Sequence, residues 1–270
     1  KYSEAESSDK ITTLIDSANA QNGYTFNGTN GRTSWKFAAK EVPDFAFSLS
    51  DHYLWDRSSV VVDSSTMRRT TVNAAYKSSS KDFVEVAEFA RTAISYLSHE
   101  LPGIPFPYPA LTVFNGQGGM EFPMIVNNGS ASSRSGTYGV TIHEITHMYF
   151  PFYMGINEKR YAWMDEGLAV MLPFLSQRKV IEDSDPVNRN AKGFGTVAGT
   201  EFEIPLYIPS MQLFGGSYRT HAYTRPGMAY WFLRDALGEK LFLKALHGYI
   251  KTWNGKHPLP SDFFYSFNAS

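Results

Sequence analysis

Two histidines four residues apart flank a glutamate in the stretch His143-Glu144-Ile145-Thr146-His147. Residues four apart share one face of an α-helix, so both imidazoles can reach the same ion. The glutamate beside the first histidine can then act as a general base on a water bound to that ion. The pattern predicts a metal site for hydrolysis, with His143 and His147 as ligands and Glu144 as the base.

A catalytic zinc ion takes three protein ligands and keeps a fourth position open. Glu166 follows His147 after the eighteen residues 148–165, a gap that lets one helix end and an antiparallel helix return. Asp165 is adjacent, but one step along a helix turns it about 100° away, so Glu166 is the better candidate. The chain has no cysteine and hence no thiolate ligand. These three side chains predict a site for one zinc ion.

The stretch "GQGGMEFPM" at 116–124 places a single carboxylate, Glu121, in a glycine-rich apolar run. Burying an unpaired carboxylate costs several kcal/mol, so Glu121 either faces solvent or meets a cation. Gly118 and Gly119 have no Cβ, so a substrate backbone could lie close to this strand edge.

These motifs together resemble the gluzincin zinc aminopeptidases typified by aminopeptidase N. The HExxH pair, the eighteen-residue gap and Trp163-Met164-Asp165-Glu166-Gly167-Leu168-Ala169 are similar to the family's Trp-Leu-Asn-Glu-Gly-Phe-Ala signature. Gly118-Gly119-Met120-Glu121 is similar to its Gly-x-Met-Glu signature, although Phe122 and Pro123 depart from the usual Asn form. The resemblance runs from about residue 39 to the C-terminus.

The resemblance implies roles for further residues. Glu121 would bind the free α-ammonium of a peptide, beside a substrate-binding strand edge at Gly118, Gly119 and Met120. A tyrosine about sixty residues after Glu166 would donate to the developing oxyanion. Tyr223 is the candidate, with Tyr218 and Tyr230 as alternatives, because the spacing from Tyr223 to Gly227 is one residue longer than the family's pattern.

The expected function is therefore a zinc-dependent aminopeptidase that hydrolyses the N-terminal bond of peptides through a zinc-bound water. Two alternatives stay open: a thermolysin-like zinc endopeptidase, and an inactive peptide-binding domain. Glu121 argues against the endopeptidase, which has no need of an amine anchor. Among the remaining histidines only His221 invites inspection, because it neighbours Tyr223.

The elements that must position these residues follow a β-rich, then helical order, which predicts an α+β fold. Strands are expected at 33–42, 44–50, 58–65, 110–115 and 120–126, and a loop at 127–139. Helices are expected at 80–103, 141–150, 163–175, 226–238 and after 239, with a last one capped by Ser261 or Asp262. The resemblance implies a thermolysin-like catalytic domain over 41–270, with a β-rich lobe at 41–139 and a helical lobe at 140–270. Residues 1–40 would be leading strands or the remnant of an upstream β domain.

The overall composition limits which classes of binding partner are expected. The 270 residues are 43% hydrophobic and carry a net charge of −1, which gives no reason to expect nucleic acid or an anionic membrane. No apolar run approaches the length of a membrane-spanning helix. The absence of cysteine, with many Ser, Thr and Asn residues, favours a periplasmic or secreted location. A start without Met and an abrupt end predict further domains of the same polypeptide.

Overall fold

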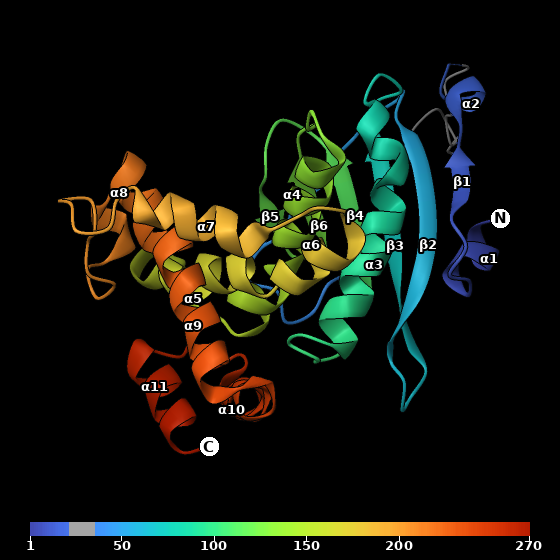
Figure 1. The fold of residues 1–270 in the computed structure, drawn as a ribbon. Helices are drawn as coiled ribbons and strands as arrows, with labels where there is room; N and C mark the ends of the chain where they lie inside the picture. The colour runs from blue at the N-terminus through green and yellow to red at the C-terminus, as the bar shows by residue number, and fades with distance from the viewer. Residues whose placement is uncertain (22–35) are drawn as a thin grey trace.

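A computed structural model describes residues 1–21 and 36–270 of the chain. A sheet with its covering helices forms one side of the molecule, and a group of helices forms the other (Figure 1). The order along the chain is β-rich first and helical second, as predicted. No helix within the described ranges is both long enough and apolar enough to cross a membrane.

Six strands form one mixed sheet in the described part of the chain. Their spatial order is β1 (Thr12–Ile15), β2 (Leu54–Asp63), β3 (Arg68–Tyr76), β4 (Ala110–Asn115), β6 (Ile125–Asn128) and β5 (Glu121–Phe122). The pairs β3–β4 and β4–β6 are parallel, and the other three pairs are antiparallel. The sheet therefore ends at β5, the strand that begins with Glu121.

The long helix α3 (Val86–His99) makes the crossover between the parallel strands β3 and β4. Ala90, Ala93, Ile94 and Leu97 recur at helical spacing and are fully buried against the sheet. A short 3₁₀ helix, η2 (Lys81–Glu85), precedes it. The helix predicted at 80–103 is thus confirmed with a shorter α-helical part.

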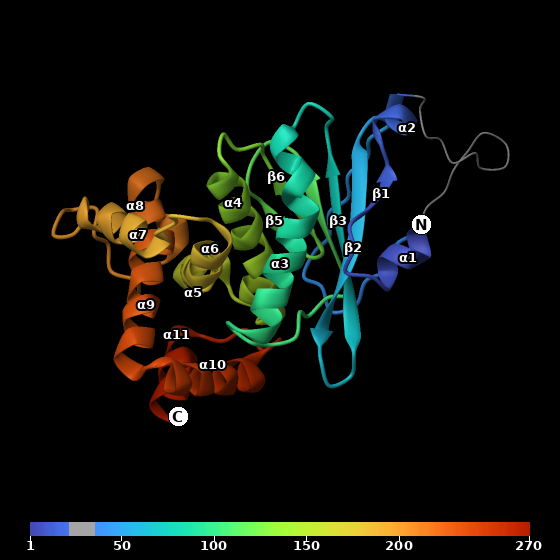
Figure 2. The same cartoon turned by 45° about the vertical axis from the view of Figure 1, so that its right-hand side comes forward.

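The helical side of the molecule begins with α4, which lies beside α3 over the same face of the sheet (Figure 2). The helices are α4 (Arg134–Thr146), η3 (Met148–Tyr153), α5 (Glu158–Met171), α6 (Phe174–Val180), α7 (Pro186–Gly195), η4 (Ser210–Gln212), α8 (Gly215–Arg219), η5 (Thr220–Thr224), α9 (Arg225–Leu237), α10 (Glu239–Trp253) and α11 (Pro260–Asn268). Two short helices, α1 (Tyr2–Glu6) and α2 (Ser17–Gln21), flank β1 at the start of the chain.

Close contact between α5 and α9 depends on two glycines. A Cβ on Gly167 would lie 2.6 Å from Pro226 Cβ, and one on Gly227 would lie 2.6 Å from Val170 Cγ1. Neither position has room for a Cβ atom, and glycine at both lets the two helices approach closely. Because η5 continues directly into α9, this packing also fixes Tyr223 against α5.

The strands predicted at 33–42 and 44–50 are wrong where the structure describes them. Residues 33–35 lie outside the described ranges, and residues 36–50 form no strand. The apolar side chains Phe37, Phe45 and Phe47 are exposed. A strand needs a neighbouring edge for its hydrogen bonds, and the two sheet edges, β1 and β5, do not pair with this segment. Apolar alternation alone is therefore not enough to predict a strand in this segment.

Several boundaries also differ from prediction, and three of them have a local cause. The segment 120–126 is not one strand, because a turn at Pro123–Met124 folds it into the antiparallel pair β5–β6. The predicted loop at 127–139 is helical from Arg134, since Ser133 accepts the Gly136 N–H and caps α4. The last helix starts at Pro260, after Leu259, and Asp262 accepts the Leu259 N–H instead of preceding the helix.

Candidate metal centre

The side chains of His143, His147 and Glu166 meet between α4 and α5. The two Nε2 atoms lie 3.3 Å apart, and Glu166 Oε2 lies 3.2 Å from the first and 3.4 Å from the second. A tetrahedral zinc site with bonds of about 2.0–2.1 Å separates its ligand atoms by about 3.3–3.4 Å. The triangle therefore has the size of one face of a zinc coordination tetrahedron.

Hydrogen bonds on the far side of each imidazole fix which nitrogen faces the triangle. His143 Nδ1 lies 3.1 Å from the Ala169 carbonyl oxygen, and His147 Nδ1 lies 2.9 Å from that of Phe150. A carbonyl oxygen only accepts, so each Nδ1 carries a proton and donates. Each Nε2 is then the atom available to a metal.

The electrostatics at His147 favour an added positive charge. Burial lowers the pKa of His147, but the charges and hydrogen bonds of Asp165 and Glu166 outweigh burial and raise that pKa well above its ordinary value. A site that stabilises an extra proton on this ring also stabilises a cation beside it. The donor set of two imidazoles and one carboxylate, with no thiolate, fits zinc.

Asp165 orients one ligand without reaching the triangle. Its Oδ1 accepts from His147 Nδ1 at 2.6 Å, and both side chains are only 1% exposed. The preference for Glu166 over Asp165 as a ligand stays a prediction, and sequence reasoning missed the contact between Asp165 and His147. The available signal was a carboxylate beside a ligand glutamate on a helix that must pack against the histidines.

We expect Asp165→Asn to weaken zinc binding by about 10–100-fold, because a carboxylate behind a ligand imidazole raises its basicity and holds its orientation. Competition with a chromophoric chelator measures the affinity. Asp56→Asn is the matched control: Asp56 is also buried and accepts from Tyr76 Oη at 2.6 Å, but it lies in the sheet. An affinity for zinc that Asp165→Asn leaves unchanged would contradict the expectation.

Glu144 lies next to His143 on α4 and is 4% exposed. Burial raises the pKa of Glu144, the two histidines oppose this, and the net direction is upward. A Cβ on Gly119 would collide with Glu144 Oε1, whereas a Cβ on Gly118 would meet no atom within 4 Å. The glycine at 119 therefore makes room for the Glu144 carboxylate, and of these two glycines only Gly118 borders open space.

Glu121 lies on the His147 side of the triangle and is 8% exposed. One of its carboxylate oxygens is within 4.8 Å of ligand atoms of Glu144 and His147, and likewise of Asp165 and Glu166. No hydrogen bond or ion pair to its carboxylate occurs among the described residues. Glu121 is therefore a buried acid beside further acids, and a cation would relieve this arrangement.

The backbone of β5 beside Glu121 forms one edge of the sheet in the described part of the chain. Met120 exchanges two hydrogen bonds with Asn127 of β6, at 3.1 and 2.8 Å, and its side chain is largely exposed. In an antiparallel pair the neighbouring residues, Gly119 and Glu121, point their backbone groups the other way. An extended peptide could pair with that edge.

Of the three candidate tyrosines, Tyr223 reaches the metal ligands. Its hydroxyl donates to Glu166 Oε1 at 2.5 Å, and its ring stacks near that of His143 with centroids 6.0 Å apart. Burial and the nearby Glu166 charge raise the pKa of Tyr223, so its hydroxyl stays a donor. Tyr218 lies one ring away, 6.3 Å from Tyr223, and Tyr230 is buried against Trp163.

His221 belongs to no group of potential metal ligands within the described ranges. Its side chain is fully buried, and burial lowers its pKa, which keeps the ring neutral. The proximity to Tyr223 in sequence does not bring His221 into the candidate centre.

Comparison with known proteins supports the architecture. No protein-family model and no curated protein matches the chain in sequence. Among solved structures, the M1 zinc metallopeptidase from Deinococcus radiodurans is similar at 19% identity and a TM-score of 0.61. A point mutant of that enzyme gives a TM-score of 0.62, and the mutant bound to a Tyr-Ser-Ala substrate gives 0.61, both at 19% identity. Each match covers 80% of this chain and 48% of that chain.

At this identity the likeness establishes the fold, which the chain shares with part of these metallopeptidases. The chain spans about half the length of the structures it matches. What it hydrolyses, and with which residues, has to be argued from its own site.

Proposed function

We propose that the chain is a zinc-dependent aminopeptidase domain of the thermolysin-like type that removes the first residue of peptides with a free N-terminus. The triangle of His143, His147 and Glu166 ligand atoms, with edges of 3.2–3.4 Å, is the observation that carries the proposal. Two imidazoles and a carboxylate would hold one zinc ion. Zinc bound there would supply a Lewis acid that polarises a peptide carbonyl and makes water more acidic.

Glu144 is the proposed general base. It is buried beside the triangle, where a carboxylate can accept a proton from water. In this role Glu144 takes a proton from the attacking water and later delivers it to the departing amine. Gly119 supports the role, since its missing Cβ leaves space for the carboxylate.

Tyr223 is the proposed oxyanion donor. Its hydroxyl is protonated and lies at the ligand group, where it donates to Glu166. A small reorientation would aim the same O–H at the oxygen of a scissile carbonyl. Such a donor stabilises charge that develops in the transition state.

Glu121 sets which bond is cut. Its buried carboxylate lacks a cationic partner among the described residues, and a peptide ammonium would supply one. A peptide held there by its first residue would lie along Gly118, Gly119 and Met120 and pair with the outward backbone groups of Gly119. Its first peptide bond would then reach the metal. An endopeptidase has no use for this acid, and an inactive binding domain would not require a buried base at Glu144.

Hydrolysis of matched fluorogenic substrates tests the proposal. We expect one zinc ion per chain, and cleavage of a free aminoacyl amide at least roughly a hundredfold faster than its N-acetylated form. A chelator should abolish cleavage, and added zinc should restore it. Equal rates on both substrates would favour the endopeptidase, and zinc binding without turnover would favour the inactive domain.

A further inference from the structure

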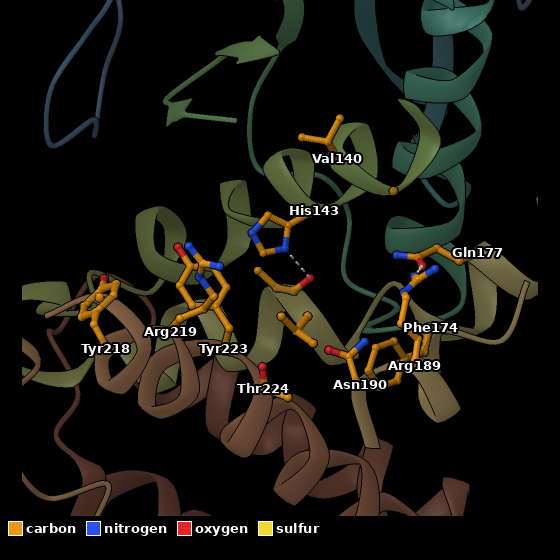
Figure 3. A pocket seen from close by; sticks show the side chains of 14 residues that line it. Val140, His143, Phe174, Gln177, Arg189, Asn190, Tyr218, Arg219, Tyr223 and Thr224 are labelled. Atoms are coloured by element: carbon orange, nitrogen blue, oxygen red, sulfur yellow. Dashed lines mark hydrogen bonds between the residues drawn. The ribbon is translucent and has the colours of Figure 1, made fainter. Parts of the chain in front are cut away.

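A cavity of about 780 Å³ opens beside His143. Residues of α4, α5, α6, α7, α8 and η5 line it, and His143 and Tyr223 form part of its wall (Figure 3). This volume falls in the range of pockets that bind small ligands. The cavity is therefore large enough to take part of a substrate that reaches the metal ligands.

The cavity and Glu121 lie on different sides of the ligand triangle. Glu121 groups with His147 and Glu166, whereas the cavity borders His143 and is not lined by His147 or Glu121. A peptide anchored by its ammonium at Glu121 crosses the triangle at its first peptide bond. The part beyond that bond, which leaves after cleavage, then extends toward the cavity.

The cavity beside His143 is lined by basic side chains, whereas the side of the centre near Glu121 is acidic. Arg189 on α7 and Arg219 on α8 line the cavity, and no aspartate or glutamate does. Figure 3 shows the two guanidinium groups on opposite sides of the His143 ring. Arg189 Nη2 donates to Gln177 Oε1 at 3.2 Å, and neither arginine forms an ion pair within the described residues.

Arg189 and Arg219 are exposed side chains that border this hollow, and their positive charges attract an anion. Guanidinium groups favour carboxylates, which they can bind through two parallel hydrogen bonds. Asn190 also lines the cavity; its Nδ2 donates one N–H to the Pro186 carbonyl oxygen at 2.8 Å and has a second N–H to offer. The side of the centre near Glu121 is negatively charged instead, because Glu144 and Asp165 both lie close to Glu121.

We propose that this cavity binds a carboxylate of the departing fragment beside the guanidinium of Arg189 or of Arg219. The inference rests on the proposed aminopeptidase function and names its substrate class. The carboxylate is either the free C-terminus of a very short peptide or an acidic side chain next to the cleaved bond. Successive residues of an extended chain lie about 3.3–3.6 Å apart, so both groups fall within one or two residues of the metal ligands.

Kinetics on two peptide pairs tests the proposal. One pair is a dipeptide and its C-terminal amide, and the other is a tetrapeptide amide with Glu or Gln directly after the first bond. We expect the carboxylate member of at least one pair to have a kcat/KM at least about fivefold higher. The double variant R189Q/R219Q should bring that ratio close to one. The pair that shows the preference identifies the source of the carboxylate.

The control is Arg178→Gln, which changes an exposed arginine of α6 that does not line the cavity and should keep the ratio. Ratios near one in both pairs, or a preference that survives in R189Q/R219Q, would overturn the proposal. An aminoacyl coumarin amide has no carboxylate in its leaving group, so its cleavage reports the proposed function separately.

Calorimetric binding gives a readout that does not depend on turnover. Zinc-loaded protein with Glu144→Gln should bind the carboxylate member of the same pair about fivefold more tightly than its neutral partner. Adding R189Q/R219Q should remove the difference. Equal affinities would count against the cavity as a carboxylate site, even if the coumarin amide is not cleaved by the native protein.

Discussion

Glu144→Gln is expected to lower kcat by about a thousandfold while the protein still binds one zinc ion. Glutamine has nearly the same shape as glutamate but cannot accept a proton from water. Because Glu144 is not one of the three ligand groups of the triangle, the substitution leaves His143, His147 and Glu166 in place. Steady-state hydrolysis of an aminoacyl coumarin amide and metal analysis of the same sample measure the two effects together.

Glu182→Gln serves as the control, because Glu182 is exposed and lies outside the candidate centre. It should leave both kcat and zinc content unchanged. If Glu144→Gln kept more than about a tenth of the native kcat, Glu144 would not be the general base. If Glu144→Gln lost zinc, kcat would be measured again at saturating zinc, so that loss of the metal is separated from loss of the base.

The sequence predicted the parts of this site that depend on one helix or one short segment. His143, Glu144 and His147 are related by the period of α4, and that period is a local property of the chain. Glu166 could be added because a gap of eighteen residues accommodates a turn between antiparallel helices. The triangle of ligand atoms agrees with both steps.

Contacts that depend on how helices pack could not be read from the same pattern. The hydrogen bond from His147 to Asp165 requires the register of α5 against α4. The cavity gathers Arg189 and Arg219 from two helices separated by a long connection, and no local motif marks either residue. The need for glycine at Gly167 and Gly227 becomes visible only from the packing of α5 against α9.

In the β-rich half, the local sequence pattern predicted strands that the described structure does not form. The stretch 44–50 has the apolar alternation of a strand, but no sheet edge pairs with it in the described structure. The run 120–126 has strand composition throughout, yet Pro123 removes a backbone donor and a turn follows. That turn makes β5 a separate edge strand and leaves Glu121 at its start, facing the metal ligands.

Glu121→Gln is expected to lower kcat/KM for substrates with a free N-terminus by about a hundredfold, with most of the loss in KM. The carboxylate is buried among other acids, so its pairing with an ammonium is strong, and glutamine offers only a neutral amide. The same change should relieve repulsion with Glu144 and Glu166 in the free protein. A modest gain in melting temperature at neutral pH would accompany the loss of substrate binding.

A comparison of free and N-acetylated peptides separates an anchoring role from general damage to the centre. If Glu121 binds the ammonium, Glu121→Gln reduces cleavage of the free peptide and narrows its advantage over the acetylated one. If Glu121 only supports the fold, both substrates lose activity in the same proportion and the melting temperature falls. An unchanged preference for the free amine would therefore count against Glu121 as the anchor, whatever the total activity. Because the argument for an aminopeptidase over an endopeptidase depends on this carboxylate, that result would also reopen which peptide bond the centre cuts.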